Sequence, residues 1–600
     1  MRVWMGAAGA MAAVGLAVAG QGLAQAPPAP DGAAIFQQRC AGCHDHATGH
    51  TPSHEALTRR GATNVLMALT AGAMKPMAAG LSAADEAAVA GYLASEGAAR
   101  TEPPHPNPCA GSPAPMQPSG PAWNGWGRNF ANSRFQPAPG LTAAEVPRLK
   151  LKWAFAYPGL MAWGQPTVVG GRVFVSSSGG DVYALDASSG CTLWDFKAAA
   201  PVRTALVIGK GRTGAVAYFG DMTGGVYAVD ADSGRQVWRI QADAHPATRI
   251  TGSPVLDGGR LYVPVSSVEE GSATSPAYAC CTFRGSVEAL DAATGRLIWK
   301  TYTLPPARPY QRGGRSLMGP AGGSVWNAPT IDHKRGVLYV GDGNDYTDVD
   351  APLTDSVLAL DLKDGKVRWS RQMLKQDHWS AGCTMGGPCP ENAGPDADLS
   401  ASIVMVRTQA GRDVLVASSK AGEVFGLDPD AGGRILWRNR FGSGGIFGGV
   451  EWGMASDGHA VFVPISDSLP GAGVAKPGLG AVDAATGKTL WWKPSTPTCS
   501  WGETECRGAL SQAVTAIPGL VFAGSHDGHL RAFRAADGKV VWDTDTAAPV
   551  TPVNARSAAG GSLDAGGPTL AGGVLYVNSG YGQFLGRGGN VLLAYSVDGR

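Results

Sequence analysis

Short apolar runs separated by polar, glycine-containing turns recur along most of the chain. Residues 182–194 read VYALDASSGCTLW: an apolar strand, a turn that begins with Asp and contains Gly, and a second strand that ends in Trp. The same phrase returns at residues 226–238, 287–299, 357–369, 424–437, 479–491 and 530–542. Self-similarity at a period of roughly 45–70 residues, with four short strands per unit, is typical of β-propellers. We therefore predict an all-β propeller over residues 119–600.

The repeat also predicts the number of blades. An eighth copy at residues 591–599 stops before its Trp, and the strand at residues 151–157, which contains Trp153, can complete it and close the ring. We expect eight blades, with the recurring Trp residues docking each blade on the next. The 86 glycines and 17 tryptophans of the 600-residue chain agree with many tight turns and one repeated aromatic position.

A different pattern occupies the N-terminal part of the chain, where helical periodicity flanks a cysteine motif. Cys40, Cys43 and His44 form C-x-x-C-H, in which two thiols make thioethers to haem and the histidine ligates the iron. A thioredoxin-like redox pair or half of a zinc site would need a βαβ pattern or a second cysteine pair nearby, and neither follows. Residues 27–100 are predicted to form a small all-α class I cytochrome c domain that carries single electrons.

The second axial ligand of the iron is expected from the same domain. Met74 lies seven residues before Leu81, the spacing at which class I cytochromes c place their axial Met. The alternatives are Met77 as the thioether, or one of three nearby histidines: His46, His50 and His54. We favour Met74 and expect these histidines to be solvated loop residues.

Residues 1–26 have the pattern of an export signal, with Arg2, an apolar run and an A-x-A cleavage site that ends at Ala26. No other stretch is apolar for long enough to span a bilayer. Ten cysteines and a haem attachment motif suit an oxidising compartment. We expect a periplasmic protein with no membrane span after cleavage, and a stiff Pro-rich linker at residues 101–118. With 49 Lys and Arg against 48 Asp and Glu, no nucleic-acid partner is expected.

Local departures from the repeat carry chemical information. Glu269 and Glu270 follow an apolar strand, where two adjacent carboxylates can ligate a hard cation. Asn344, in Gly-Asp-Gly-Asn, follows another apolar strand. A solvated acidic loop and an ordinary turn are the respective alternatives.

A further departure combines acids with a lysine. Asp396 and Asp398 precede an apolar strand, and Lys420 follows the next one. A carboxylate pair and a lysine near a cation site are what proton abstraction from an alcohol needs. A surface loop of Asp residues is the alternative.

The cysteines outside the haem motif suggest disulfides. The adjacent Cys280 and Cys281 can form a vicinal disulfide, a flat and rigid platform, unless each pairs elsewhere. The other six have plausible local partners, namely Cys383 with Cys389, Cys499 with Cys506, and Cys109 with Cys191. Connectivity does not follow from sequence alone.

Taken together, the haem motif, the LDAxxGxxxW repeat and these sites resemble the alcohol dehydrogenases that depend on pyrroloquinoline quinone (PQQ). The resemblance covers residues 119–600. It implies an eight-bladed propeller with PQQ on its axis, between a Trp and a vicinal disulfide. It also implies Ca²⁺ beside the quinone, held by a Glu and an Asn, and an Asp that acts as the base.

Carried over position by position, the resemblance assigns roles to individual residues. Glu269 corresponds to the metal-binding Glu and Asn344 to the metal-ligating Asn. The expected PQQ contacts are Trp326 as the stacking Trp, Thr251 in a T-x-S-P segment, Lys420 as the residue that hydrogen-bonds the quinone oxygens, and Arg203 as the arginine that binds a PQQ carboxylate.

The chain departs from the family in two places. Where the family has its adjacent cysteines, just before Arg203, this chain has three alanines, so the contact of Cys280 and Cys281 with the quinone is an open question. The family's D-x-W-D pattern ends here in Ser380. We therefore favour Asp396 as the base over Asp377, with Asp398 similar to the extra carboxylate of lanthanide-using relatives.

The segments at residues 499–506, 516–525 and 577–581 are similar to those of family members that oxidise polyvinyl alcohol. The resemblance implies oxidation of an alcohol, a secondary one with polyvinyl alcohol as the polymeric candidate, to a ketone. Electrons would leave through haem c to an external acceptor: a cytochrome, an azurin-like protein or a quinone. The alternatives are a dehydrogenase of small alcohols, aldehydes or sugars on the same site, and a non-enzymatic haem-bearing scaffold.

Overall fold

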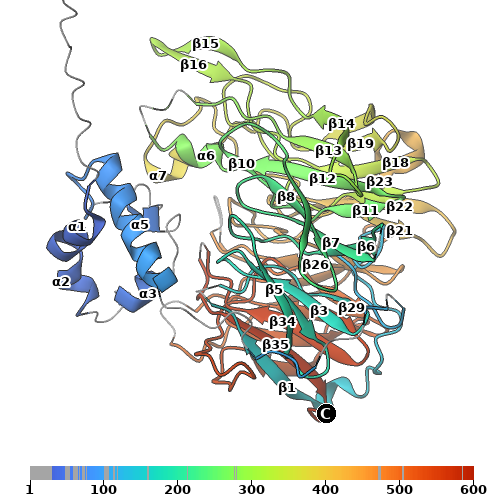
Figure 1. Ribbon diagram of the computed structural model, residues 1–600. Helices are drawn as coiled ribbons and strands as arrows, with labels where there is room; N and C mark the ends of the chain where they lie inside the picture. Colours follow the sequence, from blue (N-terminus) through green and yellow to red (C-terminus); the bar gives the residue numbers. More distant parts are fainter. Residues whose placement is uncertain are drawn as a thin grey trace, which may run out of the picture.

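The computed structural model describes residues 30–46, 54–58, 65–66, 68–69, 74–75, 77–99, 107–111, 115–117, 119–158, 161–212, 214–275, 278, 280–469, 474–502, 506–583 and 585–600. Figure 1 shows the N-terminal helices as a group apart from a large assembly of strands. They are α1 (Gly32–Arg39), α2 (Ala41–His44), α3 (His54–Thr58) and α5 (Ala83–Ala99). The helices pack on a small apolar core that includes Phe36, Val89 and Leu93.

Within the described residues, the strands form eight antiparallel sheets arranged as propeller blades, which confirms the predicted fold. Blade 1 consists of β2 (Thr167–Val169), β3 (Arg172–Ser176), β4 (Asp181–Asp186) and β5 (Thr192–Lys197), and blade 2 of β6 (Val207–Lys210), β7 (Ala215–Gly220), β8 (Gly225–Asp230) and β9 (Gln236–Gln241). Blade 3 consists of β10 (Thr248–Arg249), β11 (Val255–Asp257), β12 (Arg260–Ser267), β13 (Ser286–Asp291) and β14 (Leu297–Tyr302). Blade 4 consists of β17 (Thr330–Asp332), β18 (Val337–Gly341), β19 (Ser356–Asp361) and β20 (Val367–Gln372).

Blades 5 to 8 continue in the same order. Blade 5 consists of β21 (Val404–Arg407), β22 (Asp413–Ser418), β23 (Glu423–Asp428) and β24 (Arg434–Arg440), and blade 6 of β25 (Ala455–Ser456), β26 (Ala460–Ile465), β27 (Gly478–Asp483) and β28 (Thr489–Pro494). Blade 7 consists of β29 (Thr515–Ile517), β30 (Leu520–Gly524), β31 (His529–Arg534) and β32 (Val540–Asp545). Blade 8 consists of β33 (Thr569–Ala571), β34 (Val574–Ser579), β35 (Val591–Val597) and β1 (Leu149–Ala156). As predicted, β1 completes the last blade, with Trp153 paired to Ala594.

Shorter elements lie between the blades. A hairpin of β15 (Arg308–Arg312) and β16 (Arg315–Gly319) connects blades 3 and 4, and the short helices α6 (Glu269–Ser272) and α7 (Gly382–Met385) lie in two of the loops. Two 3₁₀ turns, η1 (Val146–Arg148) and η2 (Pro429–Ala431), complete the secondary structure that is described. Among the described residues, none of the helices has both the length and the apolar character that crossing a membrane requires.

The repeated Trp docks neighbouring blades, as the sequence predicts. Trp194 of blade 1 donates from Nε1 to the carbonyl of Ala231 in blade 2, at 2.9 Å. A Cβ placed on Gly234, in the same turn of blade 2, would lie 2.8 Å from the Trp194 ring, so glycine is required there by close approach as well as by its φ of 71°. The arrangement recurs around the ring, for example from Trp491 to Ala535 at 2.8 Å.

The segment at residues 123–136 holds the blades together from the axis. Its backbone pairs in turn with strands of several blades, through Trp123 with Val168 and Phe135 with Ala516. Arg134, which is 1% exposed, bonds the carbonyls of Trp126 and Val514 at 2.7 Å each. Residues 123–136 thereby connect blades that are distant in sequence.

Candidate functional site

A cavity of about 950 Å³ of non-protein space, partly open to solvent, lies where loops from seven of the blades converge. We call it the axial cavity. Its walls come from loops that enter the first strand of a blade, such as Arg203 and Trp326, and from turns between second and third strands, such as Lys420 and His526. The residues that carry the following description all line it: Arg203, Thr251, Glu270, Trp326, Asn344, Asp398, Lys420, Glu451, Trp452, Ser511, His526 and Asp564.

One side of the axial cavity carries a buried acid–lysine cluster. Lys420 Nζ donates to Asp396 Oδ2 at 2.5 Å and to Asp398 Oδ2 at 3.0 Å. Although burial disfavours its charge, the two aspartates hold the pKa of Lys420 well above its usual range, so the ammonium persists. Burial also raises the pKa of Asp396 well above its ordinary value, an effect that Lys420 opposes and the charge of Asp398 reinforces.

Asp396 and Asp398 differ in how their oxygens are used. Asp398 lines the axial cavity and accepts from the Asn344 backbone N–H at 2.9 Å as well as from Lys420. Asp396 lies behind the wall, 3% exposed, and its Oδ1 is buried without a hydrogen-bond partner among the described residues. Asp377 accepts from the backbone N–H groups of Asp396 and Ala397, at 3.0 and 2.5 Å, so it shapes the loop rather than lining the cavity.

The two adjacent glutamates, Glu269 and Glu270, point to different places. Glu269 is fully buried and accepts from Tyr278 Oη, from the backbone N–H of Thr282 and from that of Phe283, at 2.7 to 3.0 Å. Glu270 lines the axial cavity instead, and burial, with the charge of Asp398, raises its pKa to about 7. The inserted residues after Glu270 fold back over Glu269 and use its oxygens.

Asn344 lies on the same wall as Glu270 and Asp398. Its amide nitrogen donates to the carbonyls of Asp345 and Trp379, at 3.0 and 2.8 Å, which leaves the amide oxygen as the acceptor. Among the described residues, no three His, Cys, Asp or Glu side chains gather as a metal centre. A cation at this wall would therefore take two carboxylates, one amide oxygen and further oxygens from a ligand.

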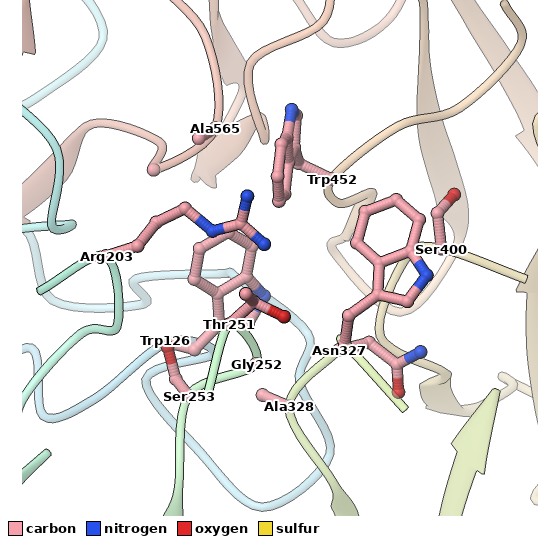
Figure 2. Close-up of a pocket in the computed structure, with 12 residues that line it drawn as sticks. Trp126, Arg203, Thr251, Gly252, Ser253, Asn327, Ala328, Ser400, Trp452 and Ala565 are labelled. Carbon is pink, nitrogen blue, oxygen red and sulfur yellow. The ribbon is translucent and has the colours of Figure 1, made fainter. Parts of the chain in front are cut away.

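Aromatic rings and a guanidinium form the deeper part of the cavity. Figure 2 shows Arg203 pointing between Thr251 and the ring of Trp452. The Arg203 guanidinium carbon lies 4.6 Å from the Trp452 ring centroid, and Trp326 meets Trp452 edge to face at 5.4 Å. Thr251 Oγ1 is 2.6 Å from Ser266 Oγ. Arg203 Nε is buried without a partner among the described residues, so it remains available to a ligand.

The vicinal disulfide forms but does not line the axial cavity. Cys280 and Cys281 are bonded to each other. Cys281 packs on Ala273, Ala321 and Tyr346, and it is Tyr346 that reaches the cavity. The loop after Glu270 thus places the disulfide behind the wall. The pairs Cys109–Cys191, Cys383–Cys389 and Cys499–Cys506 are confirmed.

In the N-terminal domain, Cys43 and His44 of the haem motif lie on α2, and Cys40 lies between α1 and α2. Cys40 and Cys43 form no disulfide, and His44 is 6% exposed. Met74 packs against the helical core, whereas Met77 is 66% exposed. His46 is exposed and His50 falls outside the described residues. His54 pairs with Asp45 at 2.9 Å.

The structure also adds residues that the sequence analysis missed on the opposite side of the axial cavity. His526 Nε2 lies 3.0 Å from Asp564 Oδ2, and Asp564 Oδ1 accepts from Trp452 Nε1 and Ser511 Oγ at 2.7 and 2.6 Å. Glu451 lies beside them. A signal was present, because His526 occupies the turn position in blade 7 that Lys420 occupies in blade 5.

Comparison with known families agrees with this geometry. The family described as glucose/ethanol/alcohol dehydrogenase, β-propeller domain, of the PQQ class, matches residues 123–437. The family described as outer membrane protein assembly factor BamB, also built from PQQ-type repeats, matches residues 420–598. The family described as cytochrome c oxidase, cbb3-type, subunit III matches residues 27–93.

Individual relatives extend the match to nearly the whole chain. A polyvinylalcohol dehydrogenase from Pseudomonas sp. is 44% identical over 95% of this chain and 94% of its own, and one from Sphingopyxis sp. is 39% identical over 95% and 93%. The solved quinohemoprotein alcohol dehydrogenase ADHIIG from Pseudomonas putida has the same fold, with a TM-score of 0.62 at 19% identity, covering 80% of each chain. The chain belongs to the PQQ-dependent alcohol dehydrogenases and, within them, groups with the polyvinyl alcohol dehydrogenases.

Proposed function

We propose that this protein oxidises secondary alcohols, polyvinyl alcohol among them, to ketones, and passes the electrons through haem c to an external acceptor in the periplasm. The observation that carries the proposal is the axial cavity, in which a guanidinium, two indole rings and an acid–lysine cluster converge. The names of the two polyvinylalcohol dehydrogenases that match along nearly their whole length support the polymeric substrate.

The cavity residues fit the family's cofactor, a flat quinone with several carboxylates. Trp326 offers an aromatic face, Arg203 has an unused buried N–H, and Thr251 offers a hydroxyl at the cavity wall. Lys420 supplies a second cation, 5.9 Å from the Trp326 centroid. When bound, PQQ supplies the hydride acceptor that no side chain provides. We assign its binding to Arg203, Thr251, Trp326 and Lys420.

The wall formed by Glu270, Asn344 and Asp398 fits a hard cation, because it presents oxygen ligands and two acidic groups. Ca²⁺ is the simplest choice, and the second aspartate also suits a trivalent lanthanide, whose higher charge favours more carboxylates. We assign Glu270 rather than Glu269 to this wall, since the oxygens of Glu269 are already used by backbone N–H groups.

We assign the proton acceptor to Asp396. Its Oδ1 has no partner among the described residues but lies behind the cavity wall, so the proton of an alcohol in the cavity reaches Asp396 through Lys420, which lines the cavity. Lys420 holds the other oxygen, which fixes the carboxylate and compensates its charge. Asp377 positions Asp396, because its carboxylate accepts hydrogen bonds from the backbone N–H groups of residues 396 and 397.

The test is haem reduction in the full-length protein. Oxidised protein with PQQ and Ca²⁺ is mixed with 2-pentanol, polyvinyl alcohol, ethanol or glucose, and the reduced cytochrome band is followed. We expect reduction that requires quinone, cation and a secondary alcohol together. Reduction by ethanol or glucose alone would support the small-substrate alternative. Tight PQQ binding without reduction by any alcohol, with Ca²⁺ or with a lanthanide, would contradict the proposal.

A further inference from the structure

The His526 side of the axial cavity is not used by the assignments above. His526 is 4% exposed, and its Nδ1 is buried without a hydrogen-bond partner among the described residues. Glu451 is 6% exposed, and its Oε1 is also buried without a hydrogen-bond partner among the described residues. Buried polar atoms without partners are uncommon in folded proteins and call for a ligand or a water. Two of them in residues of one cavity wall indicate a binding position.

The surroundings of His526 fix its ring. Asp564 receives hydrogen bonds from Trp452 and Ser511 in addition to its contact with His526 Nε2. Burial disfavours the charge of Asp564, but His526 and the hydrogen bonds from Ser511 and Ala565 outweigh it and lower the pKa of Asp564. The carboxylate is therefore ionised and orients the imidazole through Nε2, leaving Nδ1 to a ligand.

The charge at this end selects a neutral ligand. The negative charge of Asp564 already faces His526, and burial raises the pKa of Glu451 well above its usual range, which favours the neutral carboxyl of Glu451. A hydroxyl can accept from or donate to His526 Nδ1 in either protonation state of the ring, and it can also pair with the Glu451 carboxyl. A free anion would meet the negative charge of Asp564, and a cation would find both Asp564 oxygens already bonded to Trp452, Ser511 and His526.

The rest of the wall adds an apolar component. Met222, Val268, Ile446 and Phe447 line the axial cavity together with these polar groups. The matching ligand has hydroxyl groups on an aliphatic backbone. In a chain of repeating secondary alcohols, each hydroxyl has a neighbour two carbons further along, so a molecule that presents one hydroxyl for oxidation presents others to the rest of the cavity wall.

We propose that His526, oriented by Asp564 and assisted by Glu451, binds a second hydroxyl of the substrate, so that the enzyme selects polyols over simple secondary alcohols. The proposal rests on the proposed function and deepens it, because it names the residues that recognise the substrate class. His526 is here a specificity-determining residue and takes no part in the proton transfer assigned to Asp396.

The experiment compares a diol with a mono-ol in loaded full-length enzyme. We expect wild-type kcat/KM for 2,4-pentanediol to exceed that for 2-pentanol, and H526Q to lower the diol value about tenfold to a hundredfold, the loss expected for an unmet buried hydrogen bond. The value for 2-pentanol should change less than threefold. The matched control is H529Q. His529 lies three residues further on, does not line the axial cavity, and has its Nδ1 2.7 Å from Asp543 Oδ1.

A binding measurement removes the dependence on turnover. 2,4-Dimethyl-2,4-pentanediol and 2-methyl-2-pentanol have no hydrogen on the carbinol carbon and cannot be oxidised, so their Kd values can be measured by titration calorimetry. We expect the tertiary diol to bind at least tenfold more tightly than the mono-ol in wild type, and this difference to vanish in H526Q. Equal Kd values in wild type would overturn the proposal even if H526Q does not fold.

Three other outcomes distinguish failure of this proposal from failure of the proposed function. An equal loss for diol and mono-ol in H526Q would make His526 structural and contradict the proposal. Wild type that oxidises 2-pentanol as well as the diol would refute only the second hydroxyl position, and leave the alcohol dehydrogenase assignment standing. A wild type that reduces its haem with neither alcohol would refute the proposed function itself.

Discussion

The outer strands of the blades and the turns at the axial cavity come from the same repeat, yet they obey opposite rules. At the outer position, Trp recurs and makes the same contact, as from Trp194 to Ala231 and from Trp491 to Ala535. At the turn between second and third strands, the backbone recurs while the side chain changes. The position holds Ser178 in blade 1, Met222 in blade 2, Lys420 in blade 5 and His526 in blade 7.

In blades 1, 2, 5 and 7 the turn backbone is nearly the same, because each of these four turns ends in a glycine with positive φ. Gly180, Gly224, Gly422 and Gly528 have φ values of 85°, 83°, 80° and 81°. Each of them donates to the carbonyl three residues earlier, as Gly422 does to Ser419 at 3.0 Å. The fold therefore supplies one rigid frame and lets each blade present a different chemical group. A residue that keeps the repeat is structural, and one that breaks it is a candidate for function.

The largest expected effect is on the cavity side of this comparison. D396N should lower kcat about a thousandfold, because it removes the proposed proton acceptor while preserving its shape. The thermal unfolding temperature and the affinity for Ca²⁺ should stay close to wild type. Stopped-flow haem reduction with 2-pentanol measures the rate, and calorimetry measures the other two quantities.

D398N separates the two aspartates. It should weaken Ca²⁺ binding more than D396N does, since Asp398 lines the cavity beside Glu270 and Asn344. If D398N abolishes the rate at saturating Ca²⁺ while D396N keeps it, the roles of the two residues are exchanged.

On the structural side, W194A should cost about 3–5 kcal/mol of stability, since it deletes a large buried side chain and its hydrogen bond to Ala231. The rate per folded molecule at low temperature should remain near wild type. Thermal unfolding followed by circular dichroism measures the loss. V237A, at a site that is 46% exposed in the next blade, is the matched control and should change stability by less than about 0.5 kcal/mol. An active-site defect in W194A would weaken the distinction between the two regions.

The adjacent Glu269 and Glu270 compare a structural position with a cavity-lining position on the same loop. E270Q should weaken Ca²⁺ or Tb³⁺ binding about tenfold to a hundredfold with little change in unfolding temperature, because only a cavity-facing charge is lost. E269Q should instead destabilise the protein by about 1–3 kcal/mol, since its new amide would face backbone N–H donors. Metal titration and thermal unfolding, run on both variants, separate the outcomes. The reverse pattern would return the metal ligand to Glu269.

The repeat explains why so much of the fold could be predicted. Blade number and the Cys383–Cys389 and Cys499–Cys506 disulfides depend on short-range spacing, which a sequence displays directly, and ring closure through Trp153 follows from the eighth repeat that stops before its Trp. That Glu270 rather than Glu269 lines the axial cavity could not be predicted, because neighbouring residues on a loop share the same local pattern, and only the packing of the residues that follow decides which one faces inward. The displaced disulfide at Cys280 and Cys281 has the same cause.

His526 shows a different limit. Its turn matches that of Lys420, yet a histidine followed by Asp-Gly is also an ordinary turn. Its partner Asp564 is 38 residues away in the next blade, so the pair exists only in three dimensions. Comparing equivalent turn positions across blades would have singled it out.

The smallest expected effect concerns a charged group on the structural side. Glu288 on β13 is 2% exposed and lies 2.9 Å from Lys300 Nζ. Burial raises its pKa from 4.5 to about 6, although Lys300 opposes the shift. Between these two values the unfolded chain has released the proton that the folded protein still holds, so stability falls as the pH rises through that window, by about 2 kcal/mol at most.

E288Q removes this titration, while Lys300 keeps its contacts with Asp243 and the Ala242 carbonyl. We therefore expect the stability of E288Q relative to wild type to increase between pH 4.5 and pH 7, measured as the difference in unfolding temperature at each pH, with the rate of haem reduction unchanged. E423Q, a half-buried Glu in blade 5, controls for the substitution itself. A relative stability that decreases over this range would mean that attraction by Lys300 outweighs desolvation, and Glu288 would then stabilise its blade as an ion pair.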